Sequence, residues 1–381
     1  MTDSADVRDA VCPVGPEQLV RPAVLEMRPY AVAPAAGLIK LDAMENPYPW
    51  PTSLRQAWLD VLASTTVHRY PDPAGTELKA ELVRVFGIPE SASVLLGNGS
   101  DELIQLLALA FGGRDGSILS PGPSFVMYRL IAAMSGMRYH EVPLVEQDFS
   151  LDLDAMLEAI RRERPAIVYL AWPNNPTGTL YPRDAVEAIL AAAPGVVVLD
   201  EAYHAFCGES FIDALADWPN LLVMRTLSKA GLAGLRLGFL VGSPRWVEQF
   251  EKCRLPYNIN TLTQATVRLA LQHWPVFEAQ TDAICSQRAV LEAGLRAMPG
   301  VHVWSSAANF VTFRVGPGMA GAIHTGLLDA GILIKRLDGS HPLLRDCLRV
   351  TVGSAVENHA FLSAMASNML TTPTGKAADV R

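Results

Sequence analysis

The segment VVVLDEAY, residues 196–203, joins an uninterrupted apolar run to two carboxylates and a phenol. Four consecutive apolar residues without alternation are typical of a strand covered on both faces, as in a parallel sheet between helices. Asp200 directly follows this run, at the strand end where open α/β sheets bind their ligands. Because an unpaired buried carboxylate is costly, Asp200 is expected either to cap the next helix or to face a cation in a ligand.

Apolar runs of the same kind recur on both sides of this segment, from about residue 70 to 240, and alternate with helical patterns. The predicted strands are residues 93–96, 117–120, 166–171, 196–199, 221–225 and 239–241. The predicted helices are residues 101–111, 124–134, 153–162 and 182–193. This alternation predicts an α/β fold in which a mostly parallel sheet is flanked by helices.

The pattern changes after about Pro256. A helical stretch from 263 to about 295 precedes strands near 301–304 and 309–314, a helix near 319–330, and strands at 332–334 and 347–352. We therefore predict a large domain at 46–275, a smaller α+β domain formed by 1–45 and 276–370, and a polar tail at 371–381.

The composition indicates a globular chain with a buried core. It has 381 residues, of which 50% are hydrophobic, and a net charge of −8, which argues against a nucleic-acid partner or an anionic membrane. The five cysteines are scattered without a CxxC pair, so neither a disulfide framework nor a metal site is expected. We find neither a signal-peptide pattern nor an apolar run of ~18 residues, and expect a cytoplasmic protein without a membrane span.

Two further segments follow predicted strands and carry polar groups. GNGSDE, residues 97–102, opens an apolar helix; its glycines and free helical N–H groups suit a phosphate, although Ser100 before acidic residues is equally typical of a helix cap. PNNPTG, residues 173–178, is either an ordinary turn or a rigid support for the amide of Asn175.

The fourth segment, TLSKAGLAGLRLG at residues 226–238, sets Lys229 among small and apolar residues. Desolvation and nearby cations lower the pKa of a lysine and make its amine nucleophilic. Thr226, Ser228 and Arg236 add two hydroxyls and a guanidinium, which suit a phosphate. In this order, at strand ends, the four segments indicate one ligand, a phosphorylated pyridine aldehyde.

The order GNGSDE, PNNPTG, DEAY and TLSKAGLAGLR resembles the fold-type I aminotransferases that depend on pyridoxal 5′-phosphate (PLP), and most of all the histidinol-phosphate aminotransferases. The resemblance runs from MRPY at 27–30 to TVG at 351–353. It implies PLP as the cofactor and a fold-type I architecture. The run between Lys229 and Arg236 is one residue shorter than in many relatives.

By this resemblance, Lys229 holds the cofactor as a Schiff base, Asp200 pairs with the pyridine nitrogen, and Asn175 and Tyr203 hold the ring oxygen. The residues implied to bind the cofactor phosphate are Gly99, Ser100, Asp101, Thr226, Ser228 and Arg236. Phe125 would stack on the ring, although its residue type alone is typical of the core. Tyr70, in HRYP, would reach the cofactor phosphate of a neighbouring subunit, which implies a homodimer.

The resemblance also implies a substrate site built by Arg336 and Arg349, with Tyr30 beside them and Asn46 facing the imidazole. By residue type alone, Lys335 and Arg336 are equally well a solvated strand end. The implied reaction is transamination of L-histidinol phosphate with 2-oxoglutarate, which yields glutamate. An aromatic aminotransferase acting on phenylalanine or tyrosine, a threonine-phosphate decarboxylase, and a non-catalytic PLP-binding protein of this fold remain alternatives.

Overall fold

The computed structural model describes residues 15–29, 32–113 and 116–371. Residues 1–33 and 34–381 form separate compact units. The described part of the first unit contains two short helices, α1 (Pro16–Leu19) and α2 (Pro22–Leu25). All other elements belong to the second unit.

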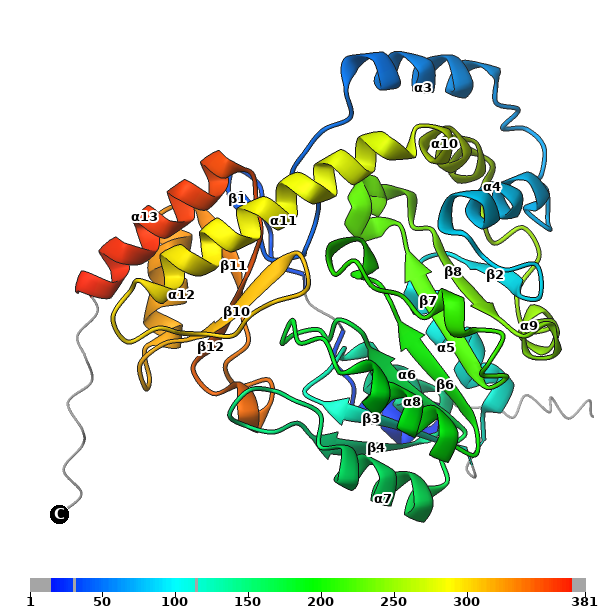
Figure 1. Ribbon diagram of the computed structural model, residues 1–381, viewed down its shortest axis with the longest axis horizontal. Helices are drawn as coiled ribbons and strands as arrows, with labels where there is room; N and C mark the ends of the chain where they lie inside the picture. Colours follow the sequence, from blue (N-terminus) through cyan, green and yellow to red (C-terminus); the bar gives the residue numbers. More distant parts are fainter. Residues whose placement is uncertain (1–14, 30–31, 114–115, 372–381) are drawn as a thin grey trace, which may run out of the picture. The chain divides into compact units, whose positions relative to one another are not determined.

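The larger sheet of the second unit has the strand order β2-β8-β7-β6-β5-β3-β4 within the described residues (Figure 1). Its strands are β2 (Ser93–Gly97), β3 (Ser117–Gly122), β4 (Arg138–Pro143), β5 (Ile167–Ala171), β6 (Val196–Asp200), β7 (Leu221–Thr226) and β8 (Gly238–Gly242). Strands β3 to β7 are parallel, whereas β8 is antiparallel to both of its neighbours. The predicted mostly parallel α/β sheet is confirmed.

Helices cover both faces of this sheet because its central strands are apolar on both sides. Tyr169 and Val198 are paired neighbours that belong to one hydrophobic core, and Val168 and Val197 belong to the other. The first core is closed by α5 (Ser100–Phe111), α6 (Met127–Ser135) and α9 (Pro244–Glu251). The second is closed by α3 (Thr52–Ser64), α4 (Thr76–Phe86), α7 (Leu153–Glu163), α8 (Arg183–Ala192) and α10 (Thr261–Gln272).

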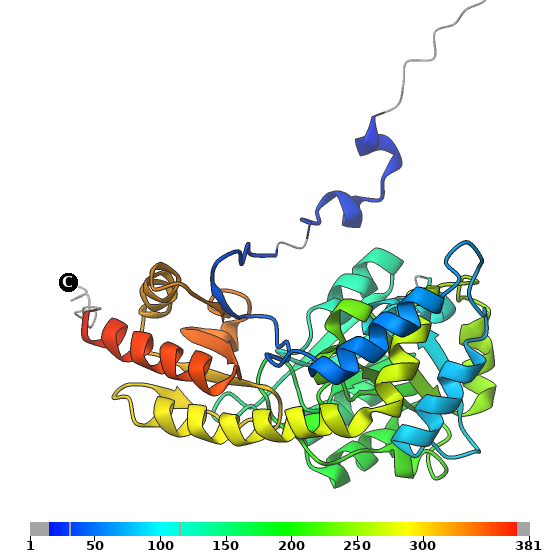
Figure 2. The ribbon, with the colours of Figure 1, turned by 90° about the horizontal axis from the view of Figure 1, so that it is seen from above.

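The smaller sheet has the order β1-β11-β12-β10-β9 among the described residues. Its strands are β1 (Ile39–Leu41), β9 (His302–Val303), β10 (Phe310–Arg314), β11 (Ile332–Arg336) and β12 (Cys347–Thr351). It shares a hydrophobic core with α11 (Trp274–Arg296), α12 (Ala320–Asp329) and α13 (Ala355–Thr371), which lie beside one another in Figure 2. Since β1 pairs with β11, a segment near residue 40 completes a sheet otherwise built from the last quarter of the chain. The domain boundaries at 46 and 276 remain a prediction.

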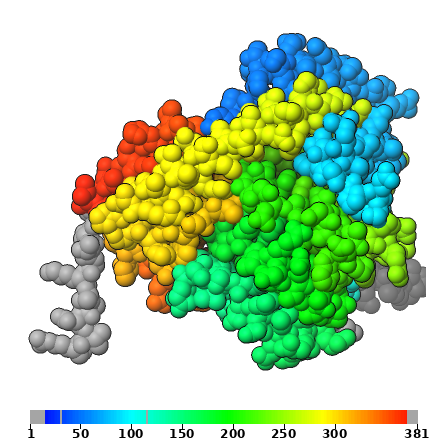
Figure 3. All heavy atoms as spheres, in the orientation of Figure 1, coloured from blue at the N-terminus to red at the C-terminus, as the bar shows by residue number. Residues whose placement is uncertain are grey.

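Helix α11 connects the two sheets. It contacts β9 and β10 of the smaller sheet as well as two short helices beside the larger one, and it forms a continuous ridge in the space-filling view (Figure 3). The single helical stretch predicted from 263 to 295 is wrong: α10 ends before His273 and α11 begins at Trp274, since Pro275 is tolerated only in a first helical turn. The short helices are η1 (His204–Phe206), η2 (Ile212–Ala214), η3 (Ser228–Leu232), η4 (Ala233–Leu235) and η5 (Pro342–Leu344).

Across residues 15–29, 32–113 and 116–371, no helix combines the length and the apolar character needed to cross a bilayer. The same residues contain no group of three or more His, Cys, Asp or Glu side chains that could hold a metal ion.

Candidate active site

Most of the predicted cofactor residues line one pocket at the carboxyl ends of β5, β6 and β7. Its lining consists of Met44, Ser100, Asp101, Phe125, Ala171, Asn175, Asp200, Ala202, Tyr203, Thr226, Ser228, Lys229 and Arg236. Met44, Ala171 and Ala202 were not predicted; they are apolar residues next to the polar motifs, and nothing in their type distinguishes them from core.

Lys229 lies in η3, the turn that directly follows β7. Gly231 has φ +118°, a conformation that glycine adopts easily, and this redirects the chain just after the lysine. The amine Nζ donates to the backbone oxygen of Ala43 at 3.1 Å. Burial, helped by the nearby guanidinium of Arg349, lowers the pKa of Lys229 to about 8. More of this amine is therefore neutral and nucleophilic near neutral pH than in an ordinary lysine.

Asp200 ends β6, and each of its carboxylate oxygens accepts a hydrogen bond. Oδ1 accepts from the backbone N–H of Ala202 at 3.1 Å, and Oδ2 accepts from the hydroxyl of Tyr128 at 2.7 Å. Burial nevertheless raises the pKa of Asp200 to about 6, because two neutral donors only partly replace lost hydration. A cationic ring N–H in the pocket would favour the ionised carboxylate, which is the role predicted for this residue.

Arg349 brings β12 of the smaller sheet to the pocket. Its Nη1 donates to Asn175 Oδ1 at 2.6 Å, and its Nη2 donates to the backbone oxygen of Asp42 at 3.0 Å. Asn175 Nδ2 in turn donates to the hydroxyl oxygen of Tyr203 at 3.2 Å. Burial raises the pKa of Tyr203, so its phenol stays protonated and can donate to a ring oxygen. Asn175 and Tyr203 thus lie together, as the motifs predict.

The other end of the pocket is formed by the start of α5. Gly99 precedes this helix and no side chain caps its free N–H groups. Arg236 lies beside them, with Nη1 3.4 Å from Ser228 Oγ and Nη2 3.4 Å from Asp101 Oδ2. A Cβ atom at Gly99 would lie 2.6 Å from Arg236 Nη2, so a larger residue would displace the guanidinium. The shortened run between Lys229 and Arg236 therefore still brings the arginine to the pocket.

These groups fit PLP in three respects. A buried amine of lowered pKa suits the aldehyde, and a buried carboxylate of raised pKa suits the ring nitrogen. An uncapped helix start beside a guanidinium and hydroxyls suits the phosphate. A Cβ atom at Gly238 would lie 2.8 Å from the backbone of Gly99 and Ser100. The start of β8 is therefore closely packed against the segment that suits the phosphate.

Among the described residues, the predicted site residues that do not line the pocket are Gly99, Tyr70, Asn46, Arg336 and Arg349. Tyr70 is 79% exposed and its ring stacks on Tyr257, with centroids 4.4 Å apart. Asn46 lies against the lysine turn, where its Nδ2 donates to the backbone oxygen of Ala230 at 3.2 Å. Tyr30 lies outside the described residues.

In the structure, Arg336 does not lie on the face of β11 that is directed toward the pocket. Ile332 and Ile334 face the helix-covered core, and Arg336, two residues further on, lies on the same side. Its Nη2 is 2.7 Å from Asp338 Oδ2. Lys335 is instead the residue paired with Arg349 across the strands, so these two side chains share a face. Thr312 of β10 is the partner of Arg349 on its other side, and it contacts the backbone oxygen of Pro176 near the pocket.

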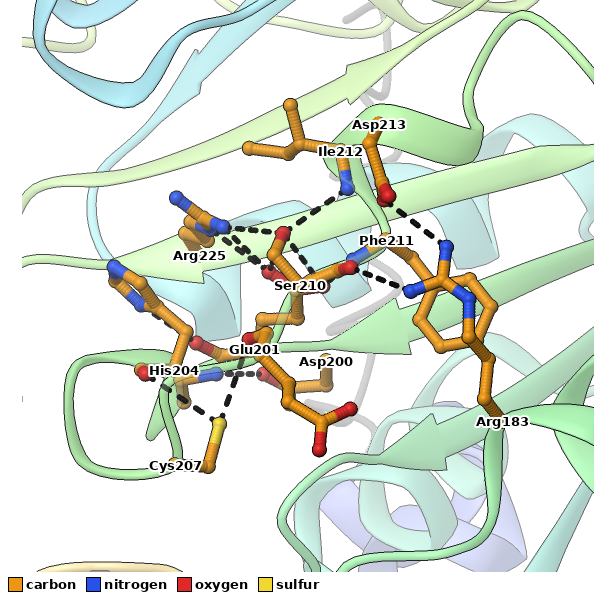
Figure 4. A network of polar contacts seen from close by, with 12 residues as sticks. Arg183, Asp200, Glu201, His204, Cys207, Ser210, Phe211, Ile212, Asp213 and Arg225 are labelled. Atoms are coloured by element: carbon orange, nitrogen blue, oxygen red, sulfur yellow. Dashed lines mark hydrogen bonds and ion pairs between the residues drawn. The ribbon is translucent and has the colours of Figure 1, made fainter.

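A buried ion pair lies behind the pocket and was not predicted (Figure 4). Glu201 follows Asp200, and Arg225 precedes Thr226, so the pair joins the ends of β6 and β7. Arg225 Nη2 and Nε lie 2.7 and 2.9 Å from Glu201 Oε2, and both side chains are almost fully buried. Ser210 and the backbone N–H of Phe211 also donate to Glu201. This network fixes the spacing of the two strand ends that carry pocket residues.

Comparison with known proteins agrees with this geometry. Residues 36–365 match the family "Aminotransferase class I and II". The chain is 53% identical over 348 residues to histidinol-phosphate aminotransferase 2 of Nitrosococcus oceani, covering 91% of this chain and 96% of that one. It is 52% identical over 349 residues to histidinol-phosphate aminotransferase of Chromobacterium violaceum, covering 92% and 97%.

Among solved structures, histidinol-phosphate aminotransferase from Sinorhizobium meliloti in complex with pyridoxal-5′-phosphate superposes with a TM-score of 0.82. It is 27% identical, with coverage of 92% of this chain and 97% of that one. The predictions of an aminotransferase fold and of PLP as its cofactor are confirmed. The chain therefore belongs to the class I and II aminotransferases.

Proposed function

We propose that this enzyme transfers the amino group of L-histidinol phosphate to 2-oxoglutarate, with PLP as its cofactor. The observation that carries the substrate is the match, along nearly the whole chain, to relatives named histidinol-phosphate aminotransferase. The pocket supports the same reaction class, because an amine, a carboxylate and an uncapped helix start lie at one sheet edge.

Four side chains, described in turn below, have roles in the proposed transamination. Bound PLP supplies an electron-withdrawing ring that stabilises negative charge on the substrate carbon next to the nitrogen. Lys229 binds the cofactor covalently and, when its amine is free, takes the proton from that carbon. Asp200 keeps the ring nitrogen protonated, and Asn175 and Tyr203 orient the ring through its oxygen. The parallel strands bring these groups together because their carboxyl ends share one edge.

We assign the substrate phosphate to Arg349 and Lys335 rather than to Arg336. Arg349 and Lys335 share the face of the small sheet that lies toward Asn175, whereas Arg336 lies on the helix side. Histidinol phosphate has no carboxylate, so paired cations at this position suit its phosphate. Asn46, which lies against the lysine turn, is the residue that we propose for a polar contact with the imidazole.

The working unit that we propose is a cytoplasmic homodimer. Tyr70 stacks on Tyr257, and Leu255 and Leu262 are exposed on the same segment of chain as Tyr257. Gln264 Nε2 donates to the backbone oxygen of Asp72, which holds this segment against the turn after Tyr70. Contiguous exposed apolar patches are typical of an interface, and we propose that these side chains belong to one. Tyr70 then extends toward the partner subunit and its cofactor phosphate.

Absorbance of the PLP-loaded protein tests the proposal. Titration with L-histidinol phosphate is expected to convert the visible cofactor band to that of pyridoxamine phosphate at low substrate concentration, and 2-oxoglutarate is expected to restore the band. Conversion by L-phenylalanine but not by histidinol phosphate would reject the substrate while keeping the aminotransferase. Failure of every amino donor to convert a bound cofactor would reject both.

A further inference from the structure

Tyr128 holds the carboxylate of Asp200 from behind the pocket. It lies on α6, is fully buried and does not line the pocket, yet its hydroxyl is 2.7 Å from Asp200 Oδ2. Its ring is stacked on Tyr169, with centroids 4.4 Å apart and planes within 6°. It also stands edge-on to Phe125, at 5.6 Å and 86°. One side chain therefore contacts both the residue placed to stack on the cofactor ring and the residue placed to bind its nitrogen.

The direction of this hydrogen bond is fixed by chemistry. Burial and the nearby carboxylate raise the pKa of Tyr128 well above its usual value, so the phenol is a neutral donor and Asp200 is the acceptor. Such a donor stabilises the ionised carboxylate and lowers its affinity for a proton. Two other acidic groups, Asp101 on α5 and Glu201 directly after β6, act in the opposite direction, although Glu201 is neutralised by Arg225.

We propose that Tyr128 is a positioning residue that makes Asp200 a weaker base than the ring nitrogen it faces, so that the proton shared by the two stays on the cofactor. The proposal rests on the cofactor orientation given under the proposed function. It adds a specific claim: without the phenolic hydroxyl, the buried carboxylate competes for that proton and the ring loses part of its positive charge.

Tyr169 is a matched control within the same stack. Its ring lies on Tyr128, both side chains are fully buried, and its hydroxyl has no hydrogen-bond partner among the described residues. Y128F and Y169F therefore each remove one hydroxyl from the same aromatic pair. Only the first removes a donor to Asp200.

The test is ¹⁵N NMR of PLP labelled at the ring nitrogen and bound to wild type, Y128F and Y169F, together with the Kd of PLP for each cofactor-free protein. In Y128F the ¹⁵N resonance is expected to move toward the unprotonated position and the Kd to rise roughly tenfold. In Y169F the resonance is expected to stay in place and the Kd to change by less than about threefold.

An unmoved resonance in Y128F, or equal movement in both variants, would overturn the role of Tyr128 while leaving the proposed function intact. An unprotonated ring nitrogen in the wild type would overturn the cofactor orientation as well. Thermal unfolding of both variants separates these outcomes from misfolding, because general loosening of the stack would lower the midpoint in both.

Discussion

In the cofactor-free protein, Asp200 and Lys229 are both buried in surroundings that disfavour their charged forms. Burial raises the pKa of Asp200 from 3.8 to about 6 and lowers that of Lys229 from 10.5 to about 8. Near neutral pH both groups are charged in the folded and the unfolded chain, so each destabilises the folded state. A cofactor that binds the amine covalently and presents a cationic nitrogen to the carboxylate removes both penalties. Cofactor binding is therefore expected to stabilise this fold strongly.

Replacing Asp200 with Asn is expected to stabilise the cofactor-free protein at pH 7. The contribution of Asp200 to wild-type stability falls as the pH rises from about 4 to about 6, because its folded-state carboxylate binds a proton more tightly than the unfolded chain does. The D200N advantage should grow over this range to at most about 3 kcal/mol. Urea unfolding at several pH values measures it, with the exposed Asp217→Asn as the control. An advantage that is independent of pH would contradict this origin.

Replacing Lys229 with Ala is expected to abolish turnover while PLP still binds without a covalent bond. Loss of the proton-transferring amine alone should lower kcat by about 10²–10⁴-fold. Steady-state kinetics and the absorbance spectrum of the bound cofactor give the two readouts. Lys252, exposed at the end of α9, provides the control K252A. Near-normal turnover in K229A would reject the proposed mechanism.

Sequence motifs predicted the pocket residues that carry unusual chemistry, and they missed residues whose role depends on geometry. Lys229 and Asp200 stand out because a charge next to apolar residues is rare. Tyr128 does not, because a tyrosine three residues after Phe125 on an apolar helix is typical of the core. Its contact with Asp200 depends on how α6 lies over β6, which no local pattern contains.

The ends of β6 and β7 are tied together by the buried pair of Glu201 and Arg225 (Figure 4). Removing one partner leaves an uncompensated buried charge, so Arg225→Met is expected to cost about 3–5 kcal/mol of unfolding free energy. Arg183, also shown in Figure 4, pairs with the exposed Asp213, and R183M should cost only about 1 kcal/mol. Denaturant unfolding compares the two. The double variant E201M/R225M should recover part of the loss, and equal costs for R225M and R183M would contradict the argument.

The register of β11 gives a prediction about two adjacent residues. Lys335 shares a face with Arg349, whereas Arg336 faces the helices and contacts Asp338. K335Q is therefore expected to raise the KM for histidinol phosphate by about 10–100-fold, the usual effect of losing a charge-assisted hydrogen bond. R336Q should change it by less than about threefold. The reverse result in steady-state kinetics would restore the assignment made from the motif spacing.

Whether a strand could be predicted from the sequence depends on whether it is buried on both faces. β5, β6 and β7 are buried along their whole length and have continuous apolar sequences, so they were predicted. β4, with the sequence RYHEVP, is an edge strand whose side chains are mostly exposed or half-buried, and its sequence has no strand pattern. The prediction for Arg336 rests on motif spacing, which ignores the two-residue period that decides which face a strand residue takes.

Across the whole molecule, the exposure of Tyr70 is the feature that one chain alone does not explain. Tyr70 is 79% exposed, and its ring stacks on that of Tyr257. In a two-fold symmetric dimer, each Tyr70 would be presented to the other subunit, so each active site would be built from two chains. Loss of the dimer should then remove activity even when every pocket residue of the chain is intact.

Subunit complementation tests this arrangement directly. K229A and Y70A homodimers are each expected to be impaired, the first because it lacks the amine and the second because it lacks the donor to the partner's cofactor phosphate. In a mixed dimer, the Y70A chain retains Lys229 and receives Tyr70 from the K229A chain, so one of its two sites is complete. Refolding the two variants together at equal concentration should therefore restore about a quarter of wild-type sites, measured by turnover with saturating PLP. If Tyr70 served its own subunit, neither site of the mixed dimer would be complete and activity would not exceed the average of the two variants.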